Sequence, residues 1–389
     1  MDFDLSEEQR MLKESVERLL EDKYSFEQRK KYVQAADGWS RELWAQYADL
    51  GLLGVPFSQD FGGFGGGPVE TMILMESFGK ALILEPYFAT VILFGGALRI
   101  GGSEAQKKAL LPKIGEGKLL GAWAHAERNS RYDLADVQTT AKKDPGAGGG
   151  WVLDGEKTVV IHGDCADKLV VSARVSGSQR DKDGIALFIV DAKALGVTRN
   201  AYPTQDSLKA ADITLKGVKV AAADQLGEPG KGHAIVEKVV QSAIQALSAE
   251  AVGGMQEMLD ITVEYLKTRQ QFGVPIGSFQ ALQHRAVDML VATEQARSMA
   301  MFAAMMVDEN DDVERQKAIN AVKVHIGKSG RYVGQQSIQL HGGIGMTLEY
   351  KVGHYFIRST MIEILFGDTE HHLAALAKAG GLIAPGTTV

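Results

Sequence analysis

The sequence predicts a mainly α-helical protein that carries a β domain in the middle of its chain. Three observations lead to this fold class. Residues 1–120 show the helical spacing of apolar side chains, residues 121–230 contain short β-rich runs, and residues 231–389 return to helical spacing. This order predicts an N-terminal helical domain, a middle β domain and a C-terminal helical bundle.

The N-terminal segment opens on a signal for a helix start. Ser6 and Gln9 have the spacing of a capping box, and Leu12 and Val16 begin an apolar helical face behind it. The glycine-rich stretch 61–67 is interpreted as a turn, because a phosphate-binding loop needs a preceding strand and a following Lys. Further helical patterns are expected at residues 40–51, 68–81, 85–100 and 104–115.

The middle segment contains runs rich in β-branched residues, separated by turn signals. Asp154-Gly155 is a hairpin signal inside the first run, which is therefore expected to fold as two short strands. Strands are expected within residues 151–161, 168–175, 184–191 and 211–220.

The C-terminal segment begins with a long helical pattern over residues 233–269, which Gly253 and Gly254 weaken. A glycine-rich block at 341–350 interrupts the later helices. These helices are expected at residues 280–308, 312–340, 351–365 and 369–379.

Composition excludes several classes of function. The 389 residues carry a net charge of −7, so nucleic-acid binding is not expected. The one cysteine, Cys165, cannot form an internal disulfide, which fits a cytoplasmic protein. No apolar run is long enough to predict a membrane span. No metal site is expected either, because the adjacent His371 and His372 point about 100° apart on a helix.

Three polar, glycine-containing segments stand out, at residues 124–133, 266–285 and 339–345. Arg269 offers a fork of donors that suits a pyrophosphate, and Gly342 with Gly343 would let backbone amides approach the same anion. The alternative interpretation is a helix–turn–helix corner with a surface Arg.

In this order and spacing, the segments resemble the acyl-CoA dehydrogenase family of flavoproteins. The resemblance covers nearly the whole chain, and its most specific blocks are TRQQFG (268–273) and LHGGIG (340–345). The FGDTEHHLA ending (366–374) is similar to small subunits of two-component enzymes of the pimeloyl-CoA dehydrogenase type. The resemblance implies an N-terminal helical domain, a middle β-barrel-like domain and a C-terminal four-helix bundle. It also implies FAD held between domains and across a subunit interface.

The resemblance also implies a set of cofactor contacts. Three residues would reach the FAD of a neighbouring subunit: Arg269, Phe272 and Gln280. Three others would lie along its pyrophosphate: Gln339, Gly342 and Gly343. The flavin ring and the rest of the cofactor would be contacted by Trp123, His125, Ala126, Val160, His162, Thr369 and His371. Val159, Ile161 and Ala126 replace a Trp and two hydroxyl residues that members usually carry, so two flavin-side hydroxyls are missing.

The catalytic base is the largest departure from the family. Members remove the α-proton with a carboxylate, and the two ways of matching its usual position place Phe366 or Gly367 there. The alternative position in some members falls at about Ala243. Asp368 is the first candidate base and Glu250 the reserve. The competing interpretations are a helix N-cap for Asp368 and an ion-paired bundle residue for Glu250.

The function that the resemblance implies is FAD-dependent α,β-dehydrogenation of an acyl-CoA thioester, with electron-transfer flavoprotein as the acceptor. Two alternatives stay open: a flavin-binding subunit whose partner chain supplies the base, and another flavin reaction on the same fold. The chain is expected to form a homo- or hetero-oligomer, because the corner from Arg269 to Gln280 would serve a second subunit.

Overall fold

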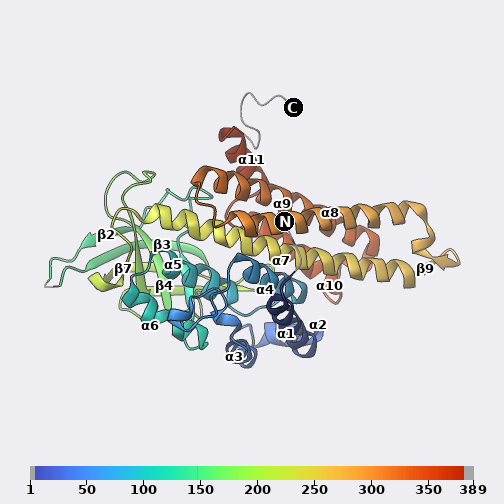
Figure 1. Cartoon of the computed structure of the whole chain (residues 1–389), viewed down its shortest axis with the longest axis horizontal. Coiled ribbons are helices and arrows are strands. Elements are labelled where there is room, and N and C mark those ends of the chain that lie inside the picture. The colour runs from blue at the N-terminus through green and yellow to red at the C-terminus, as the bar shows by residue number, and fades with distance from the viewer. Residues whose placement is uncertain (1–4, 147, 381–389) are drawn as a thin grey trace. The chain divides into compact units, whose positions relative to one another are not determined.

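The computed structural model describes residues 5–146 and 148–380, and it shows helices before and after a set of strands along the chain (Figure 1). This confirms the predicted fold class. Backbone contacts divide the chain into two compact units. The helical unit combines residues 1–30, 68–83 and 244–389, and the sheet unit combines residues 31–67 and 84–243.

The helical unit is built around α9, which contacts α8, α10 and α11; α8 and α9 lie side by side in Figure 1. The predicted capping box at the start of α1 is present, since Ser6 Oγ accepts the N–H of Gln9 at 3.2 Å and Gln9 Oε1 accepts the N–H of Ser6 at 3.0 Å. The helices of this unit are α1 (Glu7–Lys23), α4 (Pro68–Ala81), α8 (Gln280–Met306), α9 (Asp312–His341), α10 (Lys351–Ile364) and α11 (Thr369–Lys378). Within the described part of the chain, no helix combines the length and apolar composition that a bilayer crossing requires.

The sheet unit contains one eight-stranded sheet in the order β6-β7-β3-β2-β4-β5-β8, with β1 paired to β4. Apolar side chains such as Leu153, Val171, Phe188 and Ile213 alternate into a core on one face. The strands are β1 (Gly121–Ala124), β2 (Thr140–Lys143), β3 (Trp151–Ile161), β4 (Lys168–Arg174), β5 (Ile185–Asp191), β6 (Val197–Pro203), β7 (Lys209–Val220) and β8 (Gln225–Leu226). The same unit holds α3 (Arg41–Asp49), a π-helical turn (Phe88–Gly95), α5 (Gly96–Gly101) and α6 (Glu104–Gly115).

The expected hairpin at Asp154-Gly155 is wrong, because β3 runs through both residues without turning. The pairing of β3 with β7 shifts register between Leu153 and Gly155, and the extra residue lies in β7, where Lys216 and Gly217 both oppose Asp154. A Cβ at Gly155 would lie 2.6 Å from the Cα of Thr139. Glycine is therefore needed for close backbone approach at this point, which a turn signal in the sequence does not distinguish.

The long helix α7 (Gly232–Thr268) continues through Gly253 and Gly254, although these glycines weaken its sequence pattern. A Cβ at Gly253 would lie 2.0 Å from the carbonyl oxygen of Glu76 in α4. The glycine lets the two backbones of the helical unit touch, and this packing offsets its low helix propensity. Several elements lack a sequence prediction, among them α2 (Phe26–Gln34), the short strands β1, β2 and β8, and β6, whose side chains are exposed or half-buried.

Candidate functional site

Asp368 lies in the turn between α10 and α11, where it caps the second helix. Its Oδ1 accepts a hydrogen bond from the backbone N–H of His371 at 2.8 Å. The hydroxyl of Thr369 donates to Oε1 of Glu363 at 3.1 Å. The structure therefore brings the first base candidate together with two predicted cofactor residues, Thr369 and His371. Its N-cap contact agrees with the competing interpretation, and its role as a base stays a prediction.

The backbone of this turn has an unusual conformation. Phe366 and Gly367 have φ angles of 60° and 112°, in the region that side chains rarely adopt. A Cβ at Gly367 would lie 2.5 Å from Nε2 of His372. A Glu could not stand at position 367 without displacing His372, whereas position 366 already carries the large, half-buried side chain of Phe366.

Glu250, the reserve base candidate, forms a bidentate ion pair with Arg358. The guanidinium Nε donates to Oε1 at 2.6 Å, and Nη2 donates to Oε2 at 2.9 Å. Both side chains are about 10% exposed. Within the helical unit this pair joins α7 to α10, as the competing interpretation of Glu250 expects. To take a proton from a substrate, Glu250 would have to leave Arg358, and removing one partner of a buried pair is costly.

The sheet unit brings together the two segments that the sequence places along the flavin. The N–H of Thr158 donates to the carbonyl oxygen of Ala126 at 2.9 Å. The fully buried Lys157 donates from Nζ to Oε1 of Glu127 at 2.7 Å and to the carbonyl oxygen of His125 at 3.1 Å. Segment 124–128 is therefore held in place by a charged side chain of the neighbouring strand.

Electrostatics in this cluster favour a charged Lys157–Glu127 pair beside a neutral His125. Burial raises the pKa of the Glu127 carboxyl, but the charge and hydrogen bond of Lys157 outweigh it and the pKa falls. Burial lowers the pKa of Lys157 to about 8. Burial and the Lys157 charge lower the pKa of His125 to about 3, and its Nδ1 contacts Ser172 Oγ at 2.9 Å. The imidazole of His125 thus acts as a neutral hydrogen-bonding group.

The predicted flavin-side residues differ in what they can offer. The indole Nε1 of Trp123 is buried and has no hydrogen-bond partner within the described residues. Val160 is buried in the sheet core, so only its backbone can contact a ligand. Val159 is half-exposed at a φ of 51°, a strained conformation for a β-branched residue, and His162 has a φ of 52°. Such strain is typical of functional sites.

His162, Asp164 and Cys165 form a group whose ligand atoms lie within 4.8 Å of one another. Burial is the main cause that raises the pKa of Asp164, and it raises that of the Cys165 thiol to about 12. The charges of Lys209 and Arg199 act on the same carboxyl, and they would repel a metal cation. The expectation that the protein binds no metal stays a prediction.

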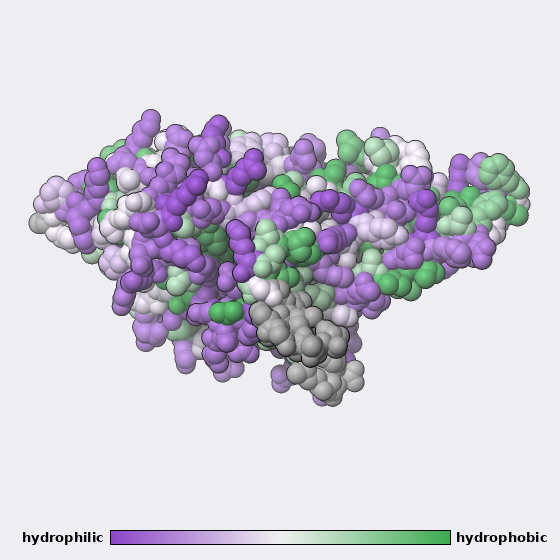
Figure 2. All heavy atoms as spheres, turned by 90° about the horizontal axis from the view of Figure 1, so that it is seen from above, coloured by the Kyte–Doolittle hydropathy of each residue, from purple (hydrophilic) through white to green (hydrophobic). Residues whose placement is uncertain are grey.

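The Arg269 corner is a two-stranded hairpin of β9 (Gln270–Gln271) and β10 (Val274–Pro275), which leads into α8 at Gln280. Phe272 at its tip is 90% exposed and has a φ of 55°. Figure 2 shows apolar side chains gathered at the end of the view where this hairpin lies. Arg269 and Gln280 are also exposed. In the single chain these side chains face solvent, as residues that serve a second subunit would.

The third predicted segment lies at the end of α9. Gly342 ends the helix with a φ of 61°, and a Cβ at Gly342 or Gly343 would meet no atom within 4 Å. Gln339, one turn earlier, is exposed. The open backbone at these glycines leaves room for a ligand to approach the amides closely, as an anion requires.

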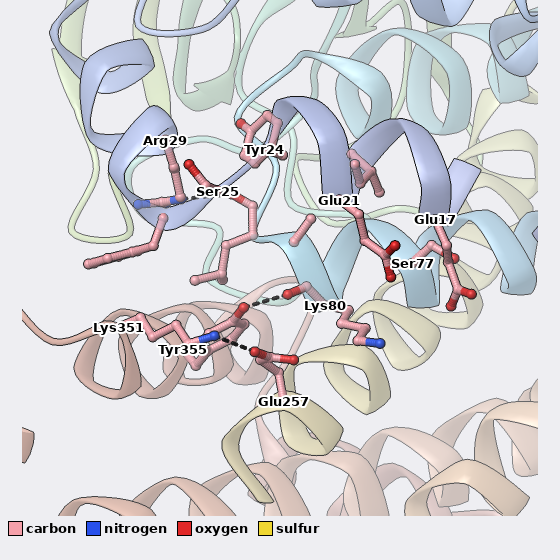
Figure 3. A pocket seen from close by; sticks show the side chains of 14 residues that line it. Glu17, Glu21, Tyr24, Ser25, Arg29, Ser77, Lys80, Glu257, Lys351 and Tyr355 are labelled. Carbon is pink, nitrogen blue, oxygen red and sulfur yellow. Dashed lines mark hydrogen bonds and ion pairs between the residues drawn. The ribbon is translucent and has the colours of Figure 1, made fainter. Parts of the chain in front are cut away.

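A cavity of about 190 Å³ in the helical unit is lined by α1, α2, α4, α7 and α10 (Figure 3). It contains none of the predicted site residues. Lys351 donates to Glu257, Tyr355 donates its hydroxyl to the carbonyl of Lys80, and Arg29 donates to the carbonyl of Leu82. The side chains of Lys351, Tyr355 and Arg29 are therefore engaged in hydrogen bonds within the helical unit.

Several buried polar residues were missed by the sequence analysis. Lys157 occupies an inward position of β3, and Lys323 lies between apolar neighbours in α9. Both are less than 2% exposed. A Lys at a position where the apolar periodicity predicts burial is the signal that could have identified them. His372, which contacts the turn of Asp368, carries no such signal.

The chain is similar to known protein families and to individual proteins over nearly its whole length. Models of the acyl-CoA dehydrogenase N-terminal, middle and C-terminal domains match residues 6–118, 122–218 and 230–381. The chain is 31% identical over 384 residues to a probable acyl-CoA dehydrogenase, YngJ, of Bacillus subtilis (strain 168), covering 97% of this chain and 99% of that protein.

Two solved structures are also similar to this chain over nearly its whole length. Butyryl-CoA dehydrogenase from Megasphaera elsdenii is 27% identical, with a TM-score of 0.89 over 97% of this chain and 99% of that chain. The FAD complex of PigA is 28% identical, with a TM-score of 0.89 over 98% of this chain and 100% of that chain.

Proposed function

The chain belongs to the acyl-CoA dehydrogenase family, and from this premise we propose how its own residues carry out the FAD-dependent α,β-dehydrogenation of an acyl-CoA thioester. The reaction breaks two C–H bonds and forms a Cα=Cβ double bond. A carboxylate takes the α-proton, and FAD, when bound, accepts the β-hydrogen as hydride. The protein must therefore bind the cofactor, exclude water and hold a base at the α-carbon.

The residues of each unit fit FAD. In the sheet unit, the buried indole N–H of Trp123 lacks a partner within the described residues and could donate to a flavin oxygen or nitrogen. In the helical unit, the open backbone at Gly342 and Gly343 suits a pyrophosphate, and the exposed guanidinium of Arg269 can neutralise such an anion.

Asp368 is the internal base in this proposal. The supporting observation is that Glu250 is held by Arg358 in a buried bidentate ion pair, whereas Asp368 is half-buried in the turn that matches the usual position of the base and caps α11. The cap also stabilises the charged form of Asp368, so it would be a weaker base than an uncapped Glu.

A second candidate function follows from the same turn. Phe366 and Gly367 occupy the positions that match the usual base, and neither can take a proton. This favours a hetero-oligomer in which the present chain binds FAD and acyl-CoA while a related partner chain supplies the carboxylate. In either case electron-transfer flavoprotein is the proposed acceptor of the electrons.

Anaerobic titration of the FAD-loaded protein with a panel of acyl-CoA thioesters tests the proposal. We expect at least one thioester to bleach the flavin absorption. The substitution Asp368→Asn keeps an N-cap residue but removes the basicity, so it should abolish bleaching while leaving FAD content and acyl-CoA binding unchanged.

The two candidates give different results. Bleaching that survives in Asp368→Asn contradicts an internal base at this residue. Bleaching that requires a related chain with a Glu at the usual position supports the hetero-oligomer. A preparation that retains FAD and binds no acyl-CoA contradicts the function itself.

A further inference from the structure

His372 is buried at the first turn of α11, and both nitrogens of its ring have a partner. Nε2 lies 3.0 Å from the carbonyl oxygen of Phe366, and Nδ1 lies 2.7 Å from Oδ1 of Asn320 in α9. The side chain is only 4% exposed. A carbonyl oxygen can only accept a hydrogen bond, so Nε2 must carry the proton that the Phe366 carbonyl receives.

Two features of the site favour the neutral form of the ring. Burial, followed by the charge of Lys323, lowers the pKa of His372 to about 3. The amide of Asn320 is placed with Oδ1 towards Nδ1, so a neutral ring with its proton on Nε2 requires this amide to be turned over, with its NH2 group donating to Nδ1. The orientation of a side-chain amide is assigned from its hydrogen bonds, and here the ring decides it.

The Phe366 carbonyl belongs to a strained segment. Phe366 has a φ of 60°, a left-handed conformation that is unfavourable for a residue with a side chain. Gly367 then takes a φ of 112°, and its missing side chain leaves the space that the ring of His372 fills. These two residues directly precede Asp368. The orientation of the Phe366 peptide group therefore determines the position of the Asp368 carboxylate.

The C-terminal end of α10 is held by another side chain of α9, on the same face as Asn320. Lys323, one turn after Asn320, donates from Nζ to the carbonyl oxygens of Ile362 and Glu363, the latter at 2.9 Å. These carbonyls belong to the last turn of the helix, where cations are favourable. The turn between α10 and α11 is thus held on one side by Lys323 and on the other by His372.

We propose that His372, kept in its neutral Nε2–H form by Asn320, is a positioning residue that fixes the Phe366 carbonyl and so the place of Asp368. The inference rests on the proposed function, in which Asp368 takes the α-proton. The charged and titratable groups that face His372 are Lys323 of α9, together with Asp368 and His371 of the turn and α11.

Two substitutions separate the hydrogen bond from simple packing. His372→Gln retains an N–H donor near the position of Nε2, whereas His372→Asn carries its donor near the position of Nδ1 and cannot reach Phe366. His354→Gln is the matched control, because His354 in α10 also bonds a backbone carbonyl, that of Leu348, away from the turn. The measurements are the anaerobic rate of flavin reduction, the dissociation constant of the acyl-CoA, and hydrogen exchange of residues 363–372.

We expect His372→Asn to slow flavin reduction by about 10- to 100-fold, since small misplacements of a catalytic group cost this much. The dissociation constant should change less than about threefold, and exchange of the turn should rise. His372→Gln should restore most of the rate, and His354→Gln should behave as the wild type.

The outcomes distinguish this inference from the proposed function. If His372→Asn loosens the turn and leaves the rate unchanged, or if Gln fails as badly as Asn, the positioning role is refuted while the function stands. A wild-type protein whose flavin no acyl-CoA reduces refutes both.

A third substitution tests the tautomer itself. Asn320→Asp replaces the amide with a group that can only accept, so it should force a proton onto Nδ1 and raise the pKa of His372. The ¹⁵N resonances of the labelled imidazole then report a charged ring in the variant and a neutral Nε2–H ring in the wild type. A charged or Nδ1–H ring in the wild type would overturn the assignment, whatever the activity.

Discussion

At the scale of single residues, the two carboxylates that sequence analysis singles out occupy different environments. Glu250 is locked in a bidentate pair with Arg358, whereas Asp368 caps a helix in a strained turn. A carboxylate near a predicted site is therefore insufficient to assign a base. The group that pairs with the carboxylate decides whether the carboxylate can accept a proton.

The Glu250–Arg358 pair should contribute strongly to stability. Glu250→Gln keeps the shape of the side chain but leaves a buried guanidinium without its counter-charge, which should lower the free energy of unfolding by about 3–5 kcal/mol. Denaturant unfolding of the FAD-loaded protein measures it, with the exposed Glu264→Gln in the same helix as the control. A variant that unfolds like the wild type but no longer reduces its flavin would move the base assignment to Glu250.

Phe366 gives a test by gain of function. Since position 367 has no room beside His372, we expect Phe366→Glu to place a carboxylate where the family keeps its base. A positioned general base contributes about 10²–10⁴-fold, so flavin reduction by acyl-CoA should accelerate if the chain lacks a strong base of its own. Stopped-flow absorbance measures the rate, and Leu365→Glu is the neighbouring control. No gain in Phe366→Glu, in a protein that still binds FAD, would contradict this placement.

At the scale of elements, the fold depends on close contacts that apolar periodicity does not describe. The helices α4 and α7 touch through glycine: a Cβ at Gly253 would lie 2.0 Å from the carbonyl oxygen of Glu76, and one at Gly79 would lie 2.0 Å from that of Glu250. These contacts join two parts of the helical unit that are far apart in sequence. They also fix the turn of α7 that carries Glu250.

The two adjacent glycines of α7 should respond in opposite directions. Gly253→Ala must push α4 away, and overpacking of this kind costs about 1–3 kcal/mol. Gly254→Ala meets Tyr355 at an ordinary 3.6 Å, so the better helix propensity of Ala should stabilise the protein by up to about 1 kcal/mol. Thermal unfolding of the pair measures both effects. Equal changes in the unfolding temperature of the two variants would show that the α4–α7 contact is looser than described.

At the scale of the whole molecule, the β9–β10 hairpin exposes an aromatic side chain that packing within the chain does not account for. Phe272 is almost fully exposed, and its ring contacts only that of Phe279 among the described aromatic pairs. Exposed aromatic and guanidinium groups together are typical of a surface that another molecule covers. A second subunit with its bound FAD is the partner that we propose.

Loss of Arg269 should therefore affect cofactor and assembly together. Arg269→Ala removes a charge-assisted contact of about 1.5–3 kcal/mol, which corresponds to roughly 10- to 100-fold weaker FAD binding. Light scattering with in-line flavin absorbance measures the oligomeric state and the FAD content in one experiment. Lys267→Ala removes an equally exposed charge two residues away and should change neither. A monomer that retains a full complement of FAD would contradict the proposal.

The sequence by itself determined the order of helices and strands, the capping box of α1 and the family, because these depend on local spacing and on motifs that lie within a few residues. It left the base open between Asp368 and Glu250, and it misread Gly155 as a turn. Only the tertiary structure shows that Gly155 faces Thr139, that Glu250 meets Arg358 and that His372 fills the space beside Gly367. Each of these contacts joins separate elements, so its energy depends on packing geometry that no local pattern encodes.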